Sequence, residues 1–405
     1  MRRDPALLAE QLAAIDAAAR RRVRQIIERC APGSDQPGSG AGVQLQVGGR
    51  TLLNFCSNDY LGLARHPQIA ASLRAAATHW GTGSGAAHLV SGHSAEHHAL
   101  EEELAAFTGR ARALLFSTGY MANLGVIDAL SGRGEVVVED ALNHASLLDG
   151  AQLAGARLRR YEHADAADAA RLLQTPQATL LATDGVFSMD GDVAPLPALA
   201  GTALAQHSWL LVDDAHGFGV LGAQGAGSAS EAGLGAREVP LLMGTLGKAC
   251  GCFGAFVAGD ADVIEYLLQK ARTFIFTTAL PPALAAATRT ALQLVRAGDE
   301  RRAHLQRLIS RFRAAALSAQ LPLLPSRTPI QPLLLGDSAA ALALSQQLAE
   351  RGFWVSAIRP PTVPANSARL RITLSAAHSE AQVDALCNVL AELWRHWPRP
   401  TAGLA

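Results

Sequence analysis

The stretch Leu241-Leu242-Met243-Gly244-Thr245-Leu246-Gly247-Lys248-Ala249 decides how the rest of this chain is interpreted. Its apolar first half has the length of a buried strand, and the chain then passes through glycine to one lysine. Lys248 and Lys270 are the only lysines, since every other basic residue is arginine. An amine in an apolar setting has a lowered pKa, which suits Schiff-base chemistry. Spacing alone favours a simpler interpretation, an exposed lysine at the end of a strand.

A nucleotide-binding P-loop is excluded. That motif needs a glycine five residues before the Gly-Lys pair and a serine or threonine after it. Leu242 and Ala249 occupy these two positions.

A second apolar run, residues 209–212, leads into Asp213 and His216. In a doubly wound sheet, ligands bind beyond the carboxyl ends of the strands. Asp213 and His216 should therefore lie in one crevice together with Thr245 and Lys248. A lysine that forms a Schiff base, an aspartate facing a pyridinium nitrogen and hydroxyl groups on a phosphate are what pyridoxal phosphate (PLP) requires.

These stretches resemble the α-oxoamine synthases, which are fold-type I PLP enzymes. The resemblance lies in residues 245–248 (Thr-Leu-Gly-Lys), 213–217 (Asp-Asp-Ala-His-Gly), 57–62 (Ser-Asn-Asp-Tyr-Leu-Gly), 143–147 (Asn-His-Ala-Ser-Leu) and 185–192 (Gly-Val-Phe-Ser-Met-Asp-Gly-Asp). It extends from about the start of the chain to about residue 395. Residues 357–364 (Ala-Ile-Arg-Pro-Pro-Thr-Val-Pro) are most similar to the family members that condense L-alanine with a pimeloyl thioester.

The resemblance implies a role for several side chains at the PLP ring. Lys248 would carry the cofactor and later remove the α-proton of alanine. Asp213 would keep the ring nitrogen protonated, and His216 would bond to the ring oxygen. His144 would stack on the ring and could polarise the incoming carbonyl, while Ser188 would orient a polar cofactor atom.

The cofactor phosphate is assigned to Gly119 and Tyr120. They open a helix directly after the expected strand 114–116, and free N–H groups at a helix N-terminus bind phosphate. Thr245 should help, and the resemblance adds Thr277 or Thr278, donated to the other subunit. We therefore expect a homodimer with active sites at the interface.

Arginines are the candidates for substrate binding. Arg369 and Arg371 alternate with apolar residues, so both should point to one face of a strand. One is expected to be structural, and the other can grip the carboxylate of alanine bidentately. The family motif implies Arg371 for the grip.

For the acyl substrate, the resemblance implies Arg21, with Arg20 and Arg22 as competitors, and Thr362. The acyl group is expected as pimeloyl-CoA or pimeloyl-acyl-carrier protein, and the sequence does not distinguish these carriers. Attack on the thioester would expel the thiol, and loss of carbon dioxide would follow. One alternative is an α-oxoamine synthase that uses glycine or another acyl-CoA, such as a glycine C-acetyltransferase. Another is a cofactor-binding protein without catalysis.

The composition fits a globular enzyme. Hydrophobic residues make up 49% of the 405 residues and charged residues 17%, with 35 basic and 35 acidic residues. The zero net charge argues against a nucleic-acid or anionic-membrane surface. Five scattered cysteines, no secretory signal and no apolar run of membrane-spanning length predict a cytoplasmic protein without disulfides.

The order of expected elements predicts an α/β fold with a mainly parallel sheet and helices on both faces. We divide the chain into an N-terminal helix and hairpin segment (1–56), a large PLP-binding domain (57–290) and a smaller α/β C-terminal domain (291–405). Strands are expected at 114–116, 136–139, 157–161, 179–183, 209–213, 241–244 and 255–258, and later at 331–335, 353–358 and 369–374.

Two further expectations concern the first hundred residues. Residues 6–29 have helical periodicity, and 43–47 with 51–55 read as a hairpin. His93, His97 and His98 have the spacing of metal ligands on a helix. No carboxylate or third ligand is evident, and Ser94 reads as the N-cap of a helix over 95–107, so no metal site is expected.

Overall fold

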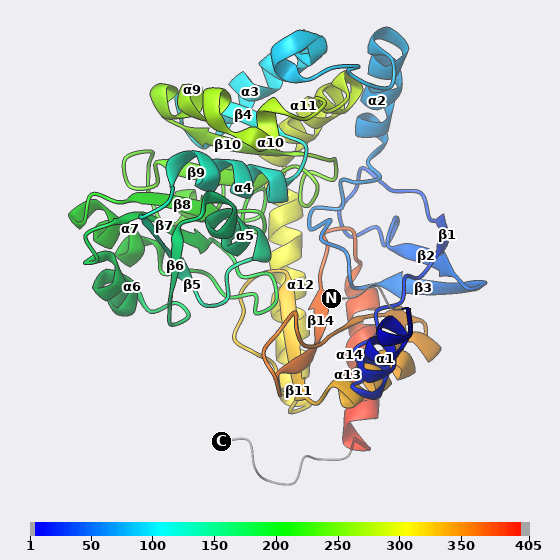
Figure 1. Cartoon of the computed structure of the whole chain (residues 1–405). Coiled ribbons are helices and arrows are strands. Elements are labelled where there is room, and N and C mark those ends of the chain that lie inside the picture. Colours follow the sequence, from blue (N-terminus) through cyan, green and yellow to red (C-terminus); the bar gives the residue numbers. More distant parts are fainter. Residues whose placement is uncertain (1–4, 398–405) are drawn as a thin grey trace. The chain divides into compact units, whose positions relative to one another are not determined.

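The computed structural model describes residues 5–397, which form two compact units (Figure 1). One unit combines the residues up to Asn58, the tripeptide Met189–Gly191 and the residues from Ala303 onward. The other combines Asp59–Ser188 with Asp192–Arg302. The three-part division of the chain stays a prediction, but the N-terminal segment shares a sheet with the C-terminal region, because β3 (Arg50–Asn54) pairs with β12 (Phe353–Trp354).

The second unit is built on a seven-stranded sheet, as the sequence predicts. Every neighbouring pair is parallel except those of β10, which runs antiparallel to both its neighbours. Because every predicted strand of this unit is present, the α/β class with a mainly parallel sheet is confirmed. The strand order is β4 (Arg112–Phe116), β10 (Ala255–Gly259), β9 (Leu241–Thr245), β8 (Trp209–Asp213), β7 (Ala178–Asp184), β5 (Val136–Asp140) and β6 (Arg157–Tyr161).

Both faces of the sheet are buried at its central strands, which explains why β7, β8 and β9 are mostly apolar runs without alternation. Val137 and Leu180 belong to one apolar cluster, whereas Val138 and Leu181 belong to the cluster on the opposite face. The first cluster includes residues of α4 (Gly119–Leu130), α5 (Ala145–Ala154), α9 (Ala261–Lys270) and α10 (Arg272–Ile275), and the second includes residues of α6 (Ala166–Leu173), α7 (Leu196–Ala205) and α8 (Ser228–Glu231).

Three more helices of this unit pack together at the β4 and β10 side of the sheet (Figure 1). They are α2 (Pro67–Trp80), α3 (Ala95–Thr108) and α11 (Pro282–Arg296). Ser94 caps α3 as predicted, with its hydroxyl and His97 forming a capping box. Two short turns complete the unit, the π-helical η1 (His88–Gly92) and the 3₁₀ turn η2 (Ala223–Gly225).

The first unit contains two small sheets. One has the order β1 (Ile27–Cys30), β2 (Gln44–Val47), β3 and β12, and the other has the order β11 (Ile330–Gly336), β14 (Ala368–Thr373) and β13 (Ser356–Ile358). The predicted strand 353–358 is therefore two strands, because its first part pairs with β3 and its last part with β14. The helices are α1 (Pro5–Ala17), α13 (Ser338–Glu350), α14 (Glu380–Arg395) and, from Ala303 onward, α12 (Asp299–Ser318).

The prediction of one helix over residues 6–29 is wrong beyond Ala17. Ala19 has a positive φ of 52°, which a helix does not accommodate. The β-branched Ile26 and Ile27 follow, and Ile27 pairs with Val47 in β1. Helix α1 has no buried residue, so its apolar periodicity does not reflect a packed face.

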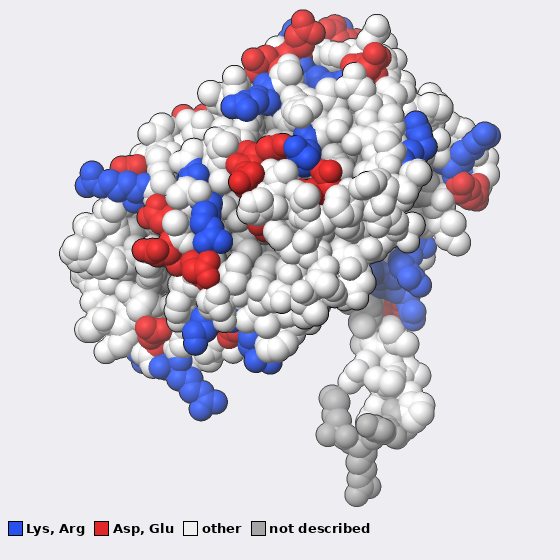
Figure 2. Space-filling view, turned by 90° about the horizontal axis from the view of Figure 1, so that it is seen from above, with Lys and Arg blue, Asp and Glu red and all other residues white. Residues whose placement is uncertain are grey.

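Charged side chains of both signs lie side by side on the face shown in Figure 2. This mixture is what the balanced composition predicts. No helix among residues 5–397 is long and apolar enough to cross a bilayer.

Candidate active site

The candidate site lies where neighbouring strands of the seven-stranded sheet end. Asp184 is the last residue of β7 and pairs in register with Asp213, the last residue of β8. Asp213 in turn pairs with Met243 of β9, which ends at Thr245. Because parallel strands end at the same edge, side chains from distant parts of the sequence meet there.

A cavity of about 220 Å³ opens at this edge. It brings together seven of the residues predicted from the sequence: Gly119, Tyr120, His144, Asp213, His216, Thr245 and Lys248. Ser188 and Thr277 belong to the same unit but do not line the cavity, and Arg21, Thr362 and Arg371 belong to the other unit. Ser146, Asp184, Ala215 and Met243 also line it.

Lys248 contacts a histidine, and that histidine contacts a tyrosine. The Lys248 Nζ lies 2.9 Å from Nε2 of His216, and the hydroxyl of Tyr60 lies 2.6 Å from Nδ1 of the same ring. When the amine donates to Nε2, the ring proton sits on Nδ1 and is donated to the Tyr60 oxygen. When the amine is the acceptor, Tyr60 donates to Nδ1 instead. Tyr60 therefore allows the pair to hold a proton in either arrangement.

Asp213 is buried and accepts two hydrogen bonds. Nδ2 of Asn123 donates to Oδ2 at 2.7 Å, and the backbone N–H of Ala215 donates to Oδ1 at 3.0 Å. Such bonds stabilise the ionised carboxylate and fix its direction. Asn123 lies on the buried face of α4.

The same asparagine connects Asp213 to His144. Nδ2 of Asn123 also donates to Oγ of Ser146 at 2.9 Å, and that oxygen lies 2.8 Å from Nδ1 of His144. His144 is the N-cap of α5, because its Nδ1 accepts from the Ser146 N–H at 3.3 Å. Burial lowers the pKa of His144, so the ring is neutral, with its proton on Nε2.

The other end of the cavity is formed by the start of α4. Thr118 is the N-cap, and its hydroxyl oxygen accepts from the N–H of Met121 at 3.1 Å. The first N–H groups of a helix have no partner within the helix, so Gly119 and Tyr120 present donors for an anion. The Thr245 hydroxyl donates to the Gly254 carbonyl at 3.2 Å, and a phosphate contact for Thr245 stays a prediction.

Asp184 was not identified from the sequence. Burial and the neighbouring Asp213 raise the pKa of Asp184 well above its usual range. Its Oδ1 is buried and has no hydrogen-bond partner within the part of the chain that the structure describes. Its place at the end of β7 was a usable signal, because the same rule identified Asp213.

The segment around Asp214 explains why residues 217 and 227 are glycines. The Asp214 carboxylate is fully buried and accepts from the Ser228 N–H at 2.8 Å, and burial raises its pKa to about 7. A Cβ on Gly217 would lie 2.1 Å from this carboxylate, and one on Gly227 would lie 1.9 Å from it. Glycine is therefore required at both positions, which hold the loop that carries His216.

In the other unit, the two arginines of β14 differ in their partners. Arg369 forms an ion pair with Asp190 at 2.5 Å and donates to the Met189 carbonyl at 3.2 Å. Arg371 donates to the side-chain oxygen of Asn58 at 3.0 Å. Both side chains are buried. The charge of Arg369 is thus matched by a carboxylate of its own unit.

The arginines proposed to bind the acyl substrate also differ in their partners. Arg21 is exposed and paired with Asp16 at 2.5 Å. Arg22 instead donates to the Thr362 hydroxyl at 3.3 Å, which joins it to the other residue predicted for this role. Of the alternatives left open by the sequence, the structure places Arg22 beside Thr362.

Comparisons with known proteins give consistent findings. The family model of class I and II aminotransferases matches residues 50–390. An 8-amino-7-oxononanoate synthase of Methylococcus capsulatus is 62% identical over 348 residues, which covers 85% of this chain and 90% of that protein. A structure of an 8-amino-7-oxononanoate synthase from Francisella tularensis has a TM-score of 0.75 at 30% identity, covering 85% of this chain and 98% of that one. A serine palmitoyltransferase variant from S. paucimobilis with bound PLP-myriocin aldimine has a TM-score of 0.88 at 28% identity, covering 96% of this chain and 97% of that one.

Proposed function

This chain belongs to the class I and II aminotransferase family and to its 8-amino-7-oxononanoate synthases, and we propose from this premise how its residues carry out the reaction. The protein is a PLP-dependent acyltransferase of biotin biosynthesis that condenses L-alanine with a pimeloyl thioester. The observation that carries this function is the identity of 62% over 85% of the chain, together with a cavity lined by Lys248, Asp213 and His216.

The donor set of the cavity fits PLP. An amine is available for its aldehyde, a buried carboxylate for its ring nitrogen and a helix N-terminus for its phosphate. When bound, PLP supplies an electron sink for the carbanion at the α-carbon of an amino acid. Lys248 would hold the aldehyde carbon, Asp213 the ring nitrogen, and Gly119 with Tyr120 the phosphate.

Lys248 is the base of this mechanism. Its amine would remove the α-proton of alanine, and His216 with Tyr60 would accommodate the change in protonation. Asp213 would hold the ring nitrogen, and hydrogen bonds from Asn123 and Ala215 fix the direction of its carboxylate. His144 donates from Nε2, since its Nδ1 is occupied by Ser146, and this N–H is suited to polarise the thioester carbonyl.

The atoms of the overall reaction balance. The α-carbon of alanine forms a bond to the thioester carbonyl carbon, and the C–S bond breaks to release the thiol. The alanine carboxylate then leaves as carbon dioxide, and a proton returns to the same carbon to give 8-amino-7-oxononanoate. The thiol belongs to CoA or to an acyl-carrier protein.

A substrate panel tests this function. Purified protein would be assayed with alanine or glycine against pimeloyl-, acetyl- and succinyl-CoA, and with alanine against pimeloyl-acyl-carrier protein. We expect carbon dioxide and the nine-carbon amino-ketone only from alanine with a pimeloyl thioester. Faster turnover of glycine with acetyl-CoA would instead indicate a glycine C-acetyltransferase.

We assign the grip on the alanine carboxylate to Arg371. A planar guanidinium offers two parallel donors to a carboxylate, and lysine does not. Arg371→Lys should therefore raise the KM for alanine by tenfold to a hundredfold, the equivalent of about 1.5–3 kcal/mol. The KM for the acyl thioester should change much less, which steady-state kinetics with each substrate varied will show.

Arg369→Lys is the matched control, because both arginines lie on β14. Its ion pair with Asp190 predicts a loss of thermal stability with the alanine KM unchanged. An alanine defect in Arg369→Lys, with none in Arg371→Lys, would reverse the two assignments.

We also propose a homodimer in which Thr277 reaches the cofactor phosphate of the partner. Val90 is 80% exposed and Phe276 is 71% exposed, and such apolar side chains support an interface in this part of the chain. Mixing Lys248→Ala chains with Thr277→Ala/Thr278→Ala chains should restore part of the activity, because each mixed dimer retains one intact site. Absence of recovery, with subunit exchange shown by mass spectrometry, would argue against shared sites.

A cytoplasmic location is part of the same proposal. It is supported by the five cysteines, all of which are free thiols. Reduced thiols are typical of the cytosol.

A further inference from the structure

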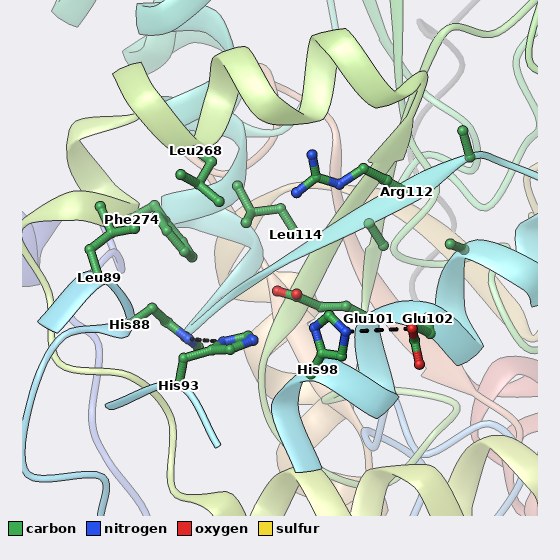
Figure 3. Close-up of a pocket in the computed structure, with 13 residues that line it drawn as sticks. His88, Leu89, His93, His98, Glu101, Glu102, Arg112, Leu114, Leu268 and Phe274 are labelled. Carbon is green, nitrogen blue, oxygen red and sulfur yellow. Dashed lines mark hydrogen bonds and ion pairs between the residues drawn. The ribbon is translucent and has the colours of Figure 1, made fainter. Parts of the chain in front are cut away.

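A second cavity lies away from the candidate active site, between α3, β4, α9 and α10 (Figure 3). Its volume is about 410 Å³. Several of the side chains that line it carry imidazole nitrogens or carboxylate oxygens, which can bind a metal ion. These residues are His88, His93, His98, Glu101 and Glu102. None of these residues has a part in the proposed reaction.

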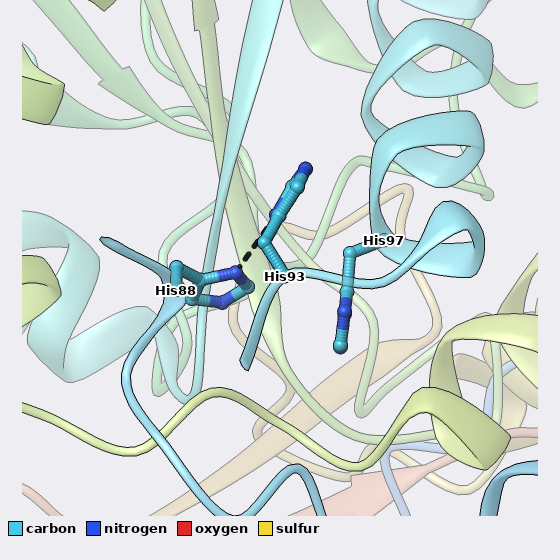
Figure 4. A group of neighbouring side chains, drawn as sticks. All are labelled: His88, His93 and His97. Carbon is cyan, nitrogen blue, oxygen red and sulfur yellow. Dashed lines mark hydrogen bonds between the residues drawn. The ribbon is translucent and has the colours of Figure 1, made fainter. Parts of the chain in front are cut away.

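The backbone builds this cluster through a π turn. In η1 the N–H of Gly92 donates to the carbonyl of Ala87 at 3.0 Å, an i to i+5 bond. This turn brings His88 next to His93, with their Nδ1 atoms 3.0 Å apart (Figure 4). A Cβ on Gly92 would lie 2.1 Å from the Ala86 carbonyl oxygen, so the turn requires glycine.

His97 lies close to both rings, but both of its ring nitrogens already form hydrogen bonds. Its Nδ1 accepts from the Ser94 N–H at 3.0 Å, as part of the cap of α3. Its Nε2 donates to the Leu280 carbonyl at 2.7 Å. Metal binding by His97 would break one of these bonds, so it is the weaker candidate of the group.

Glu101 supplies the carboxylate that the sequence interpretation did not identify. It lies three residues after His98 on α3, so both side chains lie on the same side of the helix. One carboxylate oxygen accepts from the Leu115 N–H at 3.0 Å, which fixes the group and leaves its second oxygen for a ligand. The ligand atoms of His93, His98 and Glu101 lie within 4.8 Å of one another.

We propose that His93, His98 and Glu101 bind one divalent transition-metal ion, and that His88 orients His93. Two imidazoles and one carboxylate are a ligand set suited to zinc, with the fourth position open to the cavity. A histidine that binds through Nε2 donates its Nδ1–H to an outer partner, and Nδ1 of His88 is that partner. His88 is itself held by stacking on Phe274, with ring centroids 5.0 Å apart.

The charges around this site permit a cation. Arg112 also lines the cavity, but its guanidinium is paired with Glu265 at 2.8 Å. His98 has an exposed contact with Glu102 at 3.4 Å, and such a contact contributes little stability.

The test uses chelator-treated holoenzyme titrated with Zn²⁺ by calorimetry, and with Co²⁺ as a spectroscopic probe. We expect one Zn²⁺ per chain and the visible bands of four-coordinate Co²⁺. His98→Ala and Glu101→Gln should each lower the affinity by at least about tenfold, and His88→Ala by about 10–100-fold. Glu102→Gln is one matched control, and His79→Ala is another, because His79 is exposed in the last turn of α2 and does not line the cavity. Both should bind as the unmodified protein does.

Thermal unfolding and cofactor absorbance show that each variant is folded. His98 is exposed, so His98→Ala should fold. If Glu101→Gln does not fold, the Zn²⁺ affinities of His98→Ala and His93→Ala test the site instead. Absence of a one-to-one complex overturns the site, and so does full affinity in His98→Ala. An equal loss in Glu102→Gln and Glu101→Gln overturns the assignment of Glu101.

Discussion

Lys248→Ala is expected to abolish product formation, lowering turnover by at least about 10²–10⁴-fold through loss of the general base alone. The loss should be larger than this, because the same amine holds the cofactor. The Nζ of Lys248 is placed for both roles by His216, at 2.9 Å. Single-turnover formation of 8-amino-7-oxononanoate from alanine and a pimeloyl thioester measures the effect without the contribution of product release.

Lys270→Ala is the matched control, because Lys270 is the only other lysine. It lies exposed in the last turn of α9, outside the cavity. We expect its turnover to remain close to that of the unmodified protein. Normal turnover in Lys248→Ala would remove the basis of the mechanism.

Asp213→Asn is expected to retain the cofactor and lose exchange of the alanine α-proton with solvent. An uncharged amide does not match a protonated ring nitrogen, and removing one partner of a buried ion pair costs about 3–5 kcal/mol, on the order of 10²- to 10⁴-fold in rate. Proton exchange is followed by NMR in deuterated water, and cofactor binding by absorbance. Exchange at the unmodified rate would contradict the assignment of Asp213.

Asp214→Asn separates this effect from the general cost of losing a buried carboxylate. Asp214 is the next residue and is buried as well, but it does not line the cavity. An asparagine oxygen can still accept from the Ser228 N–H. Its effect should therefore appear in thermal stability, with proton exchange largely retained.

The sheet and the centre of the site could be predicted because local patterns suffice for them. The apolar runs of β8 and β9 are visible in the sequence, and a parallel sheet places their carboxyl ends at one edge. Asp213 and Lys248 follow these runs directly, so their convergence needs no knowledge of packing.

Other parts depend on contacts between distant residues. Tyr60 meets His216 across 156 residues, and Asn123 meets Asp213 across 90, so no local pattern indicates either bond. The end of α1 was missed because its apolar residues remain exposed. The helical periodicity of this stretch therefore does not mark a packed face. His88 was missed because a π turn, with its spacing of five, brings it to His93.

The most direct test of the central claim, that Lys248 carries PLP, is borohydride reduction of the purified holoenzyme followed by digestion and mass spectrometry. Reduction makes the bond between the cofactor and an amine permanent, so the modified peptide identifies the residue. We expect a stoichiometric cofactor adduct on the peptide that contains Lys248. An adduct on Lys270, or a protein that binds PLP without any reducible bond, would contradict the assignment of the site.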